Sequence, residues 1–217
     1  MQGPAVAGHL PVRRSMPRII VQSEFFLDLP EWQVLRERTL PEALARHPAL
    51  RVWSAGCHSG KEPFSLAILL DEMGAGRSHY LLATDISDDL LARAQAGGPF
   101  AATDVGHVTA EQRARYFRPG GPPFYVTDAL RGGVTFRRHD LASDPYEGDF
   151  DVILFRDVEP FLSGPVKAAV QERLSAALRS GGSLFIGSTD TLPAWREWGF
   201  RKVSRSIYAN ADGQLSS

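Results

Sequence analysis

A loop of mostly small residues lies between two largely apolar runs in residues 51–73, RVWSAGCHSGKEPFSLAILLDEM. The first run, residues 51–55, is short and bounded, as is typical of a buried strand, and the run from Phe64 has helical spacing. The loop holds Gly56 and Gly60 and almost no side-chain bulk, so a ligand can approach its backbone closely. A loop of this kind at the carboxyl end of a parallel strand is the usual cofactor crevice of an open sheet.

An acidic residue, Asp85, ends the next apolar run, residues 80–84. A carboxylate about 20 residues beyond a glycine loop is placed to accept hydrogen bonds from two ribose hydroxyls. NAD and S-adenosylmethionine both present such a ribose. Because the loop lacks the G-x-G-x-x-G spacing of NAD-binding loops, the sequence disfavours an NAD-linked enzyme.

The elements around this loop alternate between strands and helices. We predict a helical segment at residues 23–46, with Ser23 able to cap it, and further helices after Ser87, after a capping box at Thr109 and Gln112, and at residues 165–178. Strands are predicted at residues 51–55, 80–84, 124–126, 134–136, 150–155 and 183–187, with a terminal hairpin strand at 200–209. This alternation predicts an α/β fold with a doubly wound, mostly parallel sheet.

Three segments stand outside the alternation. Residues 1–18 carry Gly, Pro and Arg without periodicity, and we interpret them as a mobile tail before one domain at residues 19–217. Residues 99–131 interrupt the pattern, and we predict a small inserted β-subdomain there. The SEFF segment, residues 23–26, has two interpretations: it covers the cofactor mouth, or Phe25 and Phe26 simply belong to the core.

Composition narrows the class of protein. The 217 residues carry a net charge of −1 and are 43% hydrophobic, so nothing points to a nucleic-acid partner or an anionic membrane. Cys57 is the single cysteine, the six histidines show no metal spacing, and no leader or membrane-spanning run is evident. We therefore expect a cytoplasmic monomer without a metal, a nucleic-acid partner or membrane insertion.

Five motifs in register resemble the CheR-type chemotaxis-receptor methyltransferases, which use S-adenosylmethionine to methylate glutamate side chains. WSAGCHSGKEPFSLA is similar to the family's WSAACSTGEEPYSLA, and LLATDISDDLLARAQAG is similar to its second strand, ATDI, and the helix that follows. VTFRRHDL, FDVILFRDV and SGGSLFIGSTDTL are similar to V-x-F-x-x-x-N/D-L, FDVIFCRNV and PGGYLFLGHSESL. The resemblance runs from about Val21 to Tyr208 and implies the Rossmann-like fold of class I methyltransferases.

The resemblance implies roles for individual residues. Glu62 matches a cofactor contact, Asp85 the ribose binder, and Asp140 with Leu141 the pair that frames the adenine. Arg156 and Asp157 match the Arg-Asn pair where substrate meets cofactor, and they are the expected catalytic residues. With S-adenosylmethionine as cofactor and S-adenosylhomocysteine as product, the expected cofactor-binding set is Ser23, Ala55, Gly56, Gly60, Glu62, Asp85, Ile86, Asp140, Leu141 and Arg156.

The resemblance also implies a partner. In this family the inserted subdomain helps docking on receptors, so residues 99–131 would face a chemoreceptor or another signalling protein. The turn at residues 118–123 is short, as in members that do not need a receptor-tail peptide. We further expect that the family's N-terminal helical domain is largely absent.

Three departures from the family pattern concern its N-x-T-x-F-F-R and R-N-V-x-x-Y-F segments. The N-x-T-x-F-F-R segment appears as residues 21–27, where Val21 replaces the asparagine and Leu27 the arginine. The R-N-V-x-x-Y-F segment appears as residues 156–162, where Phe161 lacks the tyrosine hydroxyl. The missing arginine and tyrosine are suited to holding an acceptor carboxylate in line.

The charges near these positions leave two functions open. Asp157 and Glu159 would repel a carboxylate acceptor, whereas Arg156, or Lys61 in place of a family glutamate, could compensate. The first function is a methyltransferase that acts on a protein carboxylate. The alternative is a catalytically weak or inactive S-adenosylmethionine-binding module that works through a protein partner.

Overall fold

The computed structural model describes residues 23–74 and 79–210. The predicted tail at residues 1–18 and the departure at Val21 lie outside the described residues.

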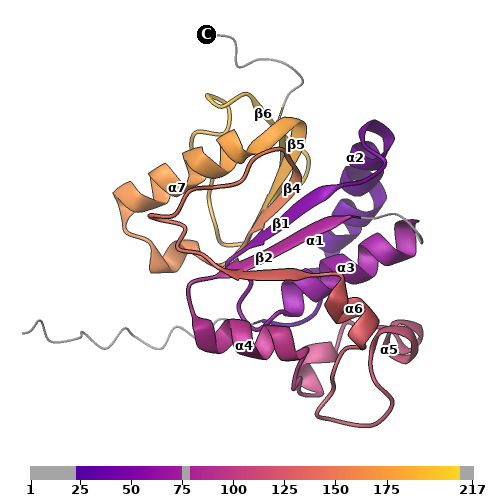
Figure 1. Cartoon of the computed structure of the whole chain (residues 1–217). Helices are drawn as coiled ribbons and strands as arrows, with labels where there is room; N and C mark the ends of the chain where they lie inside the picture. Colours follow the sequence, from indigo (N-terminus) through magenta and orange to yellow (C-terminus); the bar gives the residue numbers. More distant parts are fainter. Residues whose placement is uncertain (1–22, 75–78, 211–217) are drawn as a thin grey trace, which may run out of the picture.

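Within the described residues, seven strands form one sheet in the order β3-β2-β1-β4-β5-β7-β6 (Figure 1). The parallel strands are β1 (Arg51–Ala55), β2 (Tyr80–Asp85), β3 (Thr135–Arg138), β4 (Phe150–Phe155) and β5 (Leu178–Ile186). The antiparallel pair at one edge is β6 (Phe200–Lys202) and β7 (Ile207–Asn210). The predicted α/β class, with a doubly wound and mostly parallel sheet, is confirmed.

Helices cover both faces of the sheet (Figure 1). α3 (Lys61–Gly74) and α4 (Asp88–Ala96) pack on one face, and α7 (Gly164–Ala177) packs on the other. Alternate side chains of β1 supply the two cores, because Val52 points into the first buried cluster and Trp53 into the second. The helices that connect β1 to β2 and lead from β2 towards β3 therefore lie on one face, the helix that connects β4 to β5 lies on the other, and β1 and β4 meet where the strand order reverses.

The first helical segment begins later than predicted. α1 (Leu29–Val34) passes through a π-helical stretch, η1 (Leu35–Thr39), into α2 (Leu40–Arg46). Residues 23–28 form turns instead, so the prediction that Ser23 caps a helix is wrong. Phe26 and Asp28 have φ angles of 54° and 67°, and the Phe26 N–H donates to the Ser65 hydroxyl at 3.0 Å. These contacts with α3 override the local helical pattern.

The segment at residues 99–131 is more helical than predicted. It contains a 3-10 turn, η2 (Thr103–Val105), then α5 (Ala110–Tyr116) and α6 (Asp128–Gly132). The predicted capping box of Thr109 with Gln112 is confirmed. The predicted strand at residues 124–126 is wrong, because Phe124 bridges Phe100 while Val126 bridges Phe117, and neither bridge extends into a ladder. The boundaries of the insert stay a prediction.

The described residues contain no helix that is long and apolar enough to cross a membrane.

Candidate active site

The candidate site lies at the carboxyl ends of β1, β2 and β4, where the strand order reverses. Four of its residues have a positive φ although they are not glycine: Phe26, His58 and Asp157 at 51–59°, and Asp28 at 67°. Such conformations cost free energy and persist only where surrounding contacts hold them, and they concentrate at functional sites. The backbone thus marks the same edge of the sheet that the motifs indicate.

The loop after β1 is tied to the neighbouring strand. The N–H groups of Gly56 and Cys57 both donate to the Thr84 carbonyl at 2.8 Å, and the φ angles of Gly56 and Gly60 are 89° and 95°. A Cβ on Gly56 would lie 2.4 Å from Val158 Cγ2. The glycines are therefore required by backbone conformation and by packing within the chain. Their contact with a cofactor, like that of Ala55, stays a prediction.

Asp85 ends β2 beside this loop. Its Oδ2 accepts from the His58 N–H at 2.9 Å, and its Oδ1 accepts from the Ser87 N–H at 3.0 Å. A carboxylate has about four lone-pair sites, so both oxygens keep capacity for ribose hydroxyls. The next side chain, Ile86, is 55% exposed and offers an apolar surface at the sheet edge.

The predicted adenine pair follows β3 and reaches the same place. The His139 N–H donates to the Asp85 carbonyl at 3.0 Å, which brings residues 139–141 to the end of β2. The Asp140 N–H donates to the Asp144 carboxylate at 2.8 Å, and the Leu141 carbonyl accepts from the Tyr146 hydroxyl at 2.7 Å. Leu141 is buried in the second core cluster. The structure therefore brings Asp140 and Leu141 next to Asp85.

Glu62 is a carboxylate with too little compensation for its burial. Its side chain is 18% exposed, the Ser54 hydroxyl donates to Oε1 at 2.7 Å, and Arg156 Nη1 is 3.8 Å from Oε2. Burial raises the pKa of Glu62 from 4.5 to about 7, although Arg156 and the Ser54 hydrogen bond oppose the shift. A ligand cation at this carboxylate would be stabilised.

Arg156 faces inward. Its side chain is 4% exposed, Nη2 donates to the Leu27 carbonyl at 2.9 Å, and the guanidinium lies 4.5 Å from the Phe185 ring centroid. Its Nε is buried and has no hydrogen-bond partner among the described residues. The side chain thus connects the segment before α1 with Glu62, and its predicted contact with the substrate stays a prediction.

The second cation considered as compensation, Lys61, also faces inward. Its Nζ donates to the Ser23 carbonyl at 2.6 Å and pairs with Asp104 at 2.8 Å. Phe25 is fully buried, and its N–H donates to the Asp104 carbonyl at 2.9 Å. Lys61 therefore fastens residues 23–26 to the insert, and the interpretation of Phe25 and Phe26 as core is confirmed.

Acidic residues gather after β4 and β5. The N–H groups of Asp157 and Gly187 both donate to the Asp190 carboxylate, at 2.8 and 2.9 Å. Burial raises the pKa of Asp157, Arg156 opposes this shift, and the charge of Asp28 adds to it. Arg156 joins Leu27 to the loop after β4, and the charge of Asp28 contributes to the raised pKa of Asp157. We call Leu27, Asp28 and Asp157 together the acceptor mouth.

Three residues of the site were not predicted from the sequence: Ser54, Asp28 and Asp190. Asp190 carried a usable signal, because it follows the predicted strand at 183–187 by three residues, and carboxyl ends of parallel strands meet at one edge. Ser54 and Asp28 carried none, because only the fold brings them to Glu62 and Asp157.

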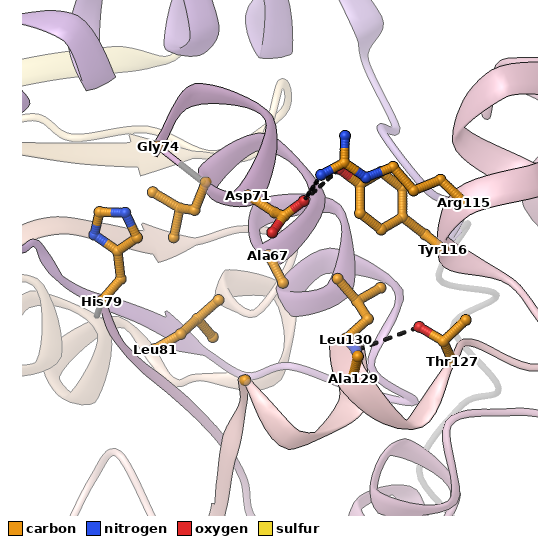
Figure 2. Close-up of a pocket in the computed structure, with 12 residues that line it drawn as sticks. Ala67, Asp71, Gly74, His79, Leu81, Arg115, Tyr116, Thr127, Ala129 and Leu130 are labelled. Carbon is orange, nitrogen blue, oxygen red and sulfur yellow. Dashed lines mark hydrogen bonds and ion pairs between the residues drawn. The ribbon is translucent and has the colours of Figure 1, made fainter. Parts of the chain in front are cut away.

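A pocket of about 350 Å³ lies away from this site, between α3, α5, α6 and the start of β2 (Figure 2). At its rim the Asp71 carboxylate accepts from the Tyr116 hydroxyl at 2.8 Å and pairs with Arg115 at 2.6 Å, as Figure 2 shows. These contacts fasten the insert to α3. Among the described residues, no group of His, Cys, Asp or Glu side chains is arranged to hold a metal ion.

The residues of the site fit S-adenosylmethionine. The undercompensated carboxylate of Glu62 suits the cationic amino group of its methionine part, and Asp85 retains acceptor capacity for a ribose. Asp140 and Leu141 follow His139, whose N–H donates to the Asp85 carbonyl, and their contact with an adenine stays a prediction. These carboxylate acceptors therefore match the cationic amino group and the ribose hydroxyls of the cofactor.

The chain is similar to several known proteins. The family described as "CheR methyltransferase, SAM binding domain" matches residues 21–209. The chemotaxis protein methyltransferase of Listeria innocua is 34% identical over 188 residues, which cover 86% of this chain and 71% of the relative. Chemotaxis protein methyltransferase 1 of Pseudomonas aeruginosa is 35% identical over 179 residues, covering 77% of this chain and 65% of the relative. A crystal structure of a putative sarcosine dimethylglycine methyltransferase from Galdieria sulphuraria covers 74% of this chain and 46% of that chain, with 16% identity and a TM-score of 0.45.

Proposed function

The chain belongs to the CheR methyltransferase family, and on this premise we propose that it methylates glutamate side chains of a chemoreceptor, with S-adenosylmethionine as the methyl donor. One observation carries the proposal. The family match over residues 21–209 includes every residue of the site at the carboxyl ends of β1 and β4, where the strand order reverses. The matches do not favour a module that only binds the cofactor, because the relatives are themselves named as methyltransferases.

The residues of the site divide the work of binding. Asp85 would hold the ribose hydroxyls, Glu62 the amino group, and Asp140 with Leu141 the adenine. When bound, S-adenosylmethionine supplies a methyl group on a sulfonium: an acceptor carboxylate oxygen forms the new bond, the C–S bond breaks, and a methyl ester and S-adenosylhomocysteine result. A glutamate is already ionised at neutral pH, so the chain needs no general base.

Positioning the acceptor is the remaining task. Arg156 is a positioning residue, since its guanidinium holds the Leu27 carbonyl and faces Glu62 from the buried side. Leu27 and Phe161 supply no polar group to an acceptor, and Phe161 is 46% exposed. Two absent hydrogen bonds to a charged group correspond to a rate lower by on the order of 100-fold or more. We therefore expect a slow enzyme.

The native chain is tested with a chemoreceptor cytoplasmic fragment and methyl-labelled S-adenosylmethionine. We expect base-labile label on glutamate, located by mass spectrometry of the digested fragment. A fragment with glutamine at the same positions is the matched control, because it keeps the shape and removes the nucleophile. Cofactor binding without label transfer to glutamate would overturn the proposal. In that case the Leu27→Arg, Phe161→Tyr double variant would show whether the missing groups alone are responsible.

We also propose that the protein works as a monomer in the cytoplasm. The single cysteine, Cys57, is free and buried, which suits a reducing compartment. Light scattering during size-exclusion chromatography tests the oligomeric state, and a dimer mass would overturn that part.

A further inference from the structure

We infer that Arg205, on the turn between β6 and β7, binds the carboxylate of the methyl acceptor. The inference rests on the proposed function, and it adds a specificity-determining cation to the acceptor mouth. The resemblance to known methyltransferases assigns no role to this residue.

The turn lies at the same edge of the sheet as the cofactor loop. β7 runs antiparallel to β5 and pairs Ile207 with Phe185, near the carboxyl end of β5. The Ile186 N–H donates to the Ser206 carbonyl at 2.9 Å, so the turn borders the last residue of β5. The residues between β6 and β7 therefore reach the end of the sheet where the parallel strands stop.

The loop after β5 connects this turn with the acceptor mouth. A Cβ on Gly187, which follows β5, would lie 2.6 Å from the Asp157 Oδ1. From the other side, Arg205 Nη2 contacts both carboxylate oxygens of Asp28, at 3.0 and 2.8 Å. Arg205 thus contacts Asp28 directly, and its turn bonds to Ile186, the residue before the Gly187 that borders Asp157.

The turn is held in place by contacts that do not involve Arg205. The carboxylate of Glu31, in α1, accepts from the Ser204 hydroxyl and from the Ser206 N–H, the latter at 3.1 Å. The Ser204 hydroxyl in turn accepts from the Ile207 N–H at 3.1 Å. Because this buried network already joins α1 to the hairpin, the Arg205–Asp28 pair is not needed to hold the two segments together.

Within the described residues, Arg205 is the exposed cation that contacts the acceptor mouth. An anionic acceptor needs a cationic or hydrogen-bonding partner to hold its carboxylate in line. Arg156, Lys61 and Lys167 are less exposed than Arg205, at 4%, 12% and 26%, and the two lysines also pair with Asp104 and Glu159. The Arg205 side chain is 61% exposed, and its two hydrogen bonds to Asp28 use a single nitrogen, Nη2.

Asp28 shows what Arg205 can hold. It is a carboxylate bound by the guanidinium at the mouth, and its side chain is mostly buried while the arginine is open to solvent. An incoming glutamate carboxylate would share the guanidinium or displace Asp28 from it, as the guanidinium has further N–H donors. Asp28 then competes with the acceptor for Arg205, so removing the charge of Asp28 should lower the KM for the acceptor.

The test compares two variants that break the same ion pair. With the native chain and the receptor fragment, we expect Arg205→Gln to raise the KM for the fragment by about 10- to 100-fold, with the dissociation constant of S-adenosylmethionine unchanged. Asp28→Asn removes the competitor and the like charge near Asp157, so we expect it to lower that KM. Arg205→Lys keeps the charge and should give an intermediate KM. Arg201→Gln is the matched control, because Arg201 is 50% exposed on β6 and pairs with Glu42 at 3.1 Å.

The outcomes separate the inference from its premise. If Arg205 only fastened residues 27–28, Arg205→Gln and Asp28→Asn would impair the enzyme alike, and the inference would be wrong. An unchanged KM in Arg205→Gln would also overturn it, while the proposed function would stand. A native chain that binds S-adenosylmethionine and labels no glutamate would refute the proposed function, and the inference with it. Thermal unfolding of each variant identifies a folding defect, and Arg205→Lys then carries the comparison.

Discussion

Arg156 lies behind Glu62, with its Nη1 3.8 Å from the carboxylate and its Nη2 on the Leu27 carbonyl at 2.9 Å. The two residues join the start of α3, the loop after β4 and the segment before α1. Because Arg156 is almost fully buried, its charge interacts with Glu62 more strongly than with solvent. The fold therefore sets the pKa of Glu62, through the burial of its carboxylate and its distance from Arg156.

Glu62 makes the stability of the protein depend on pH. Its pKa rises from 4.5 to about 7 on folding, so the folded state binds more protons between these values. The stabilisation is complete below 4.5 and is lost as pH rises through 7, by roughly 3 kcal/mol. We expect Glu62→Gln to remove this loss, and denaturant unfolding of both proteins across the range measures it. Identical pH dependence in the two proteins would contradict the assignment.

Glu62 also makes cofactor affinity depend on pH. Its ionised form attracts the amino group of S-adenosylmethionine, so we expect affinity in the native chain to rise as pH passes about 7. Calorimetric titration with S-adenosylmethionine and S-adenosylhomocysteine tests this. The Glu62→Gln variant should bind more weakly above that pH and lose the dependence, and a variant that keeps the native profile would show that another group is responsible.

Asp85 is expected to be required for cofactor binding. Asp85→Ala removes the predicted ribose acceptors and frees the N–H groups of His58 and Ser87, so we expect affinity to fall by about 10- to 100-fold. Calorimetry measures the dissociation constant. Asp89→Ala is the control, since Asp89 is an exposed acid in the first turn of α4. Equal affinities of the two variants would refute the assignment.

Gly56 is expected to be intolerant of a side chain. Gly56→Ala places a Cβ 2.4 Å from Val158 Cγ2 at a φ of 89°, and we expect a loss of about 1–3 kcal/mol of stability. Val158→Ala should recover part of that loss by relieving the contact, although the backbone strain remains. The free energies of unfolding of the two single variants and the double variant form a cycle. Strict additivity would show that the two residues do not collide.

Asp157 is expected to slow methylation of an anionic acceptor. Asp157→Asn removes a negative charge from the acceptor mouth, and we expect kcat/KM for the receptor fragment to rise about tenfold, or ~1.4 kcal/mol. Burial raises the pKa of Asp157, so the advantage of the variant should be largest at high pH and shrink as pH falls. Rates across pH, with Asp89→Asn as the surface control, test this. A gain that does not vary with pH would argue against a charge effect.

Local pattern explains most of the fold that could be predicted. The β1 strand, the loop of small residues and α3 carry their signals within residues 51–73, and Thr109 with Gln112 caps α5 through contacts three residues apart. The failures came where distant contacts decide. Residues 23–28 directly precede α1, yet contacts with Ser65 and Asp104 keep this segment out of the helix. In the predicted strand at 124–126, Phe124 and Val126 each form an isolated bridge to a different segment, and neither bridge extends into a ladder.

The sequence by itself determined the α/β class, the family and the residues expected around the cofactor, because these depend on periodicity and on motifs of contiguous residues. Only the tertiary structure decided which charges face the acceptor. Arg156 and Lys61 lie within the motifs but turn inward, Arg156 to the Leu27 carbonyl and Lys61 to the Ser23 carbonyl and Asp104. Arg205 reaches the acceptor mouth because chain segments 177 residues apart meet at Asp28. No local pattern encodes such a meeting, since it arises only when the hairpin of β6 and β7 packs beside β5.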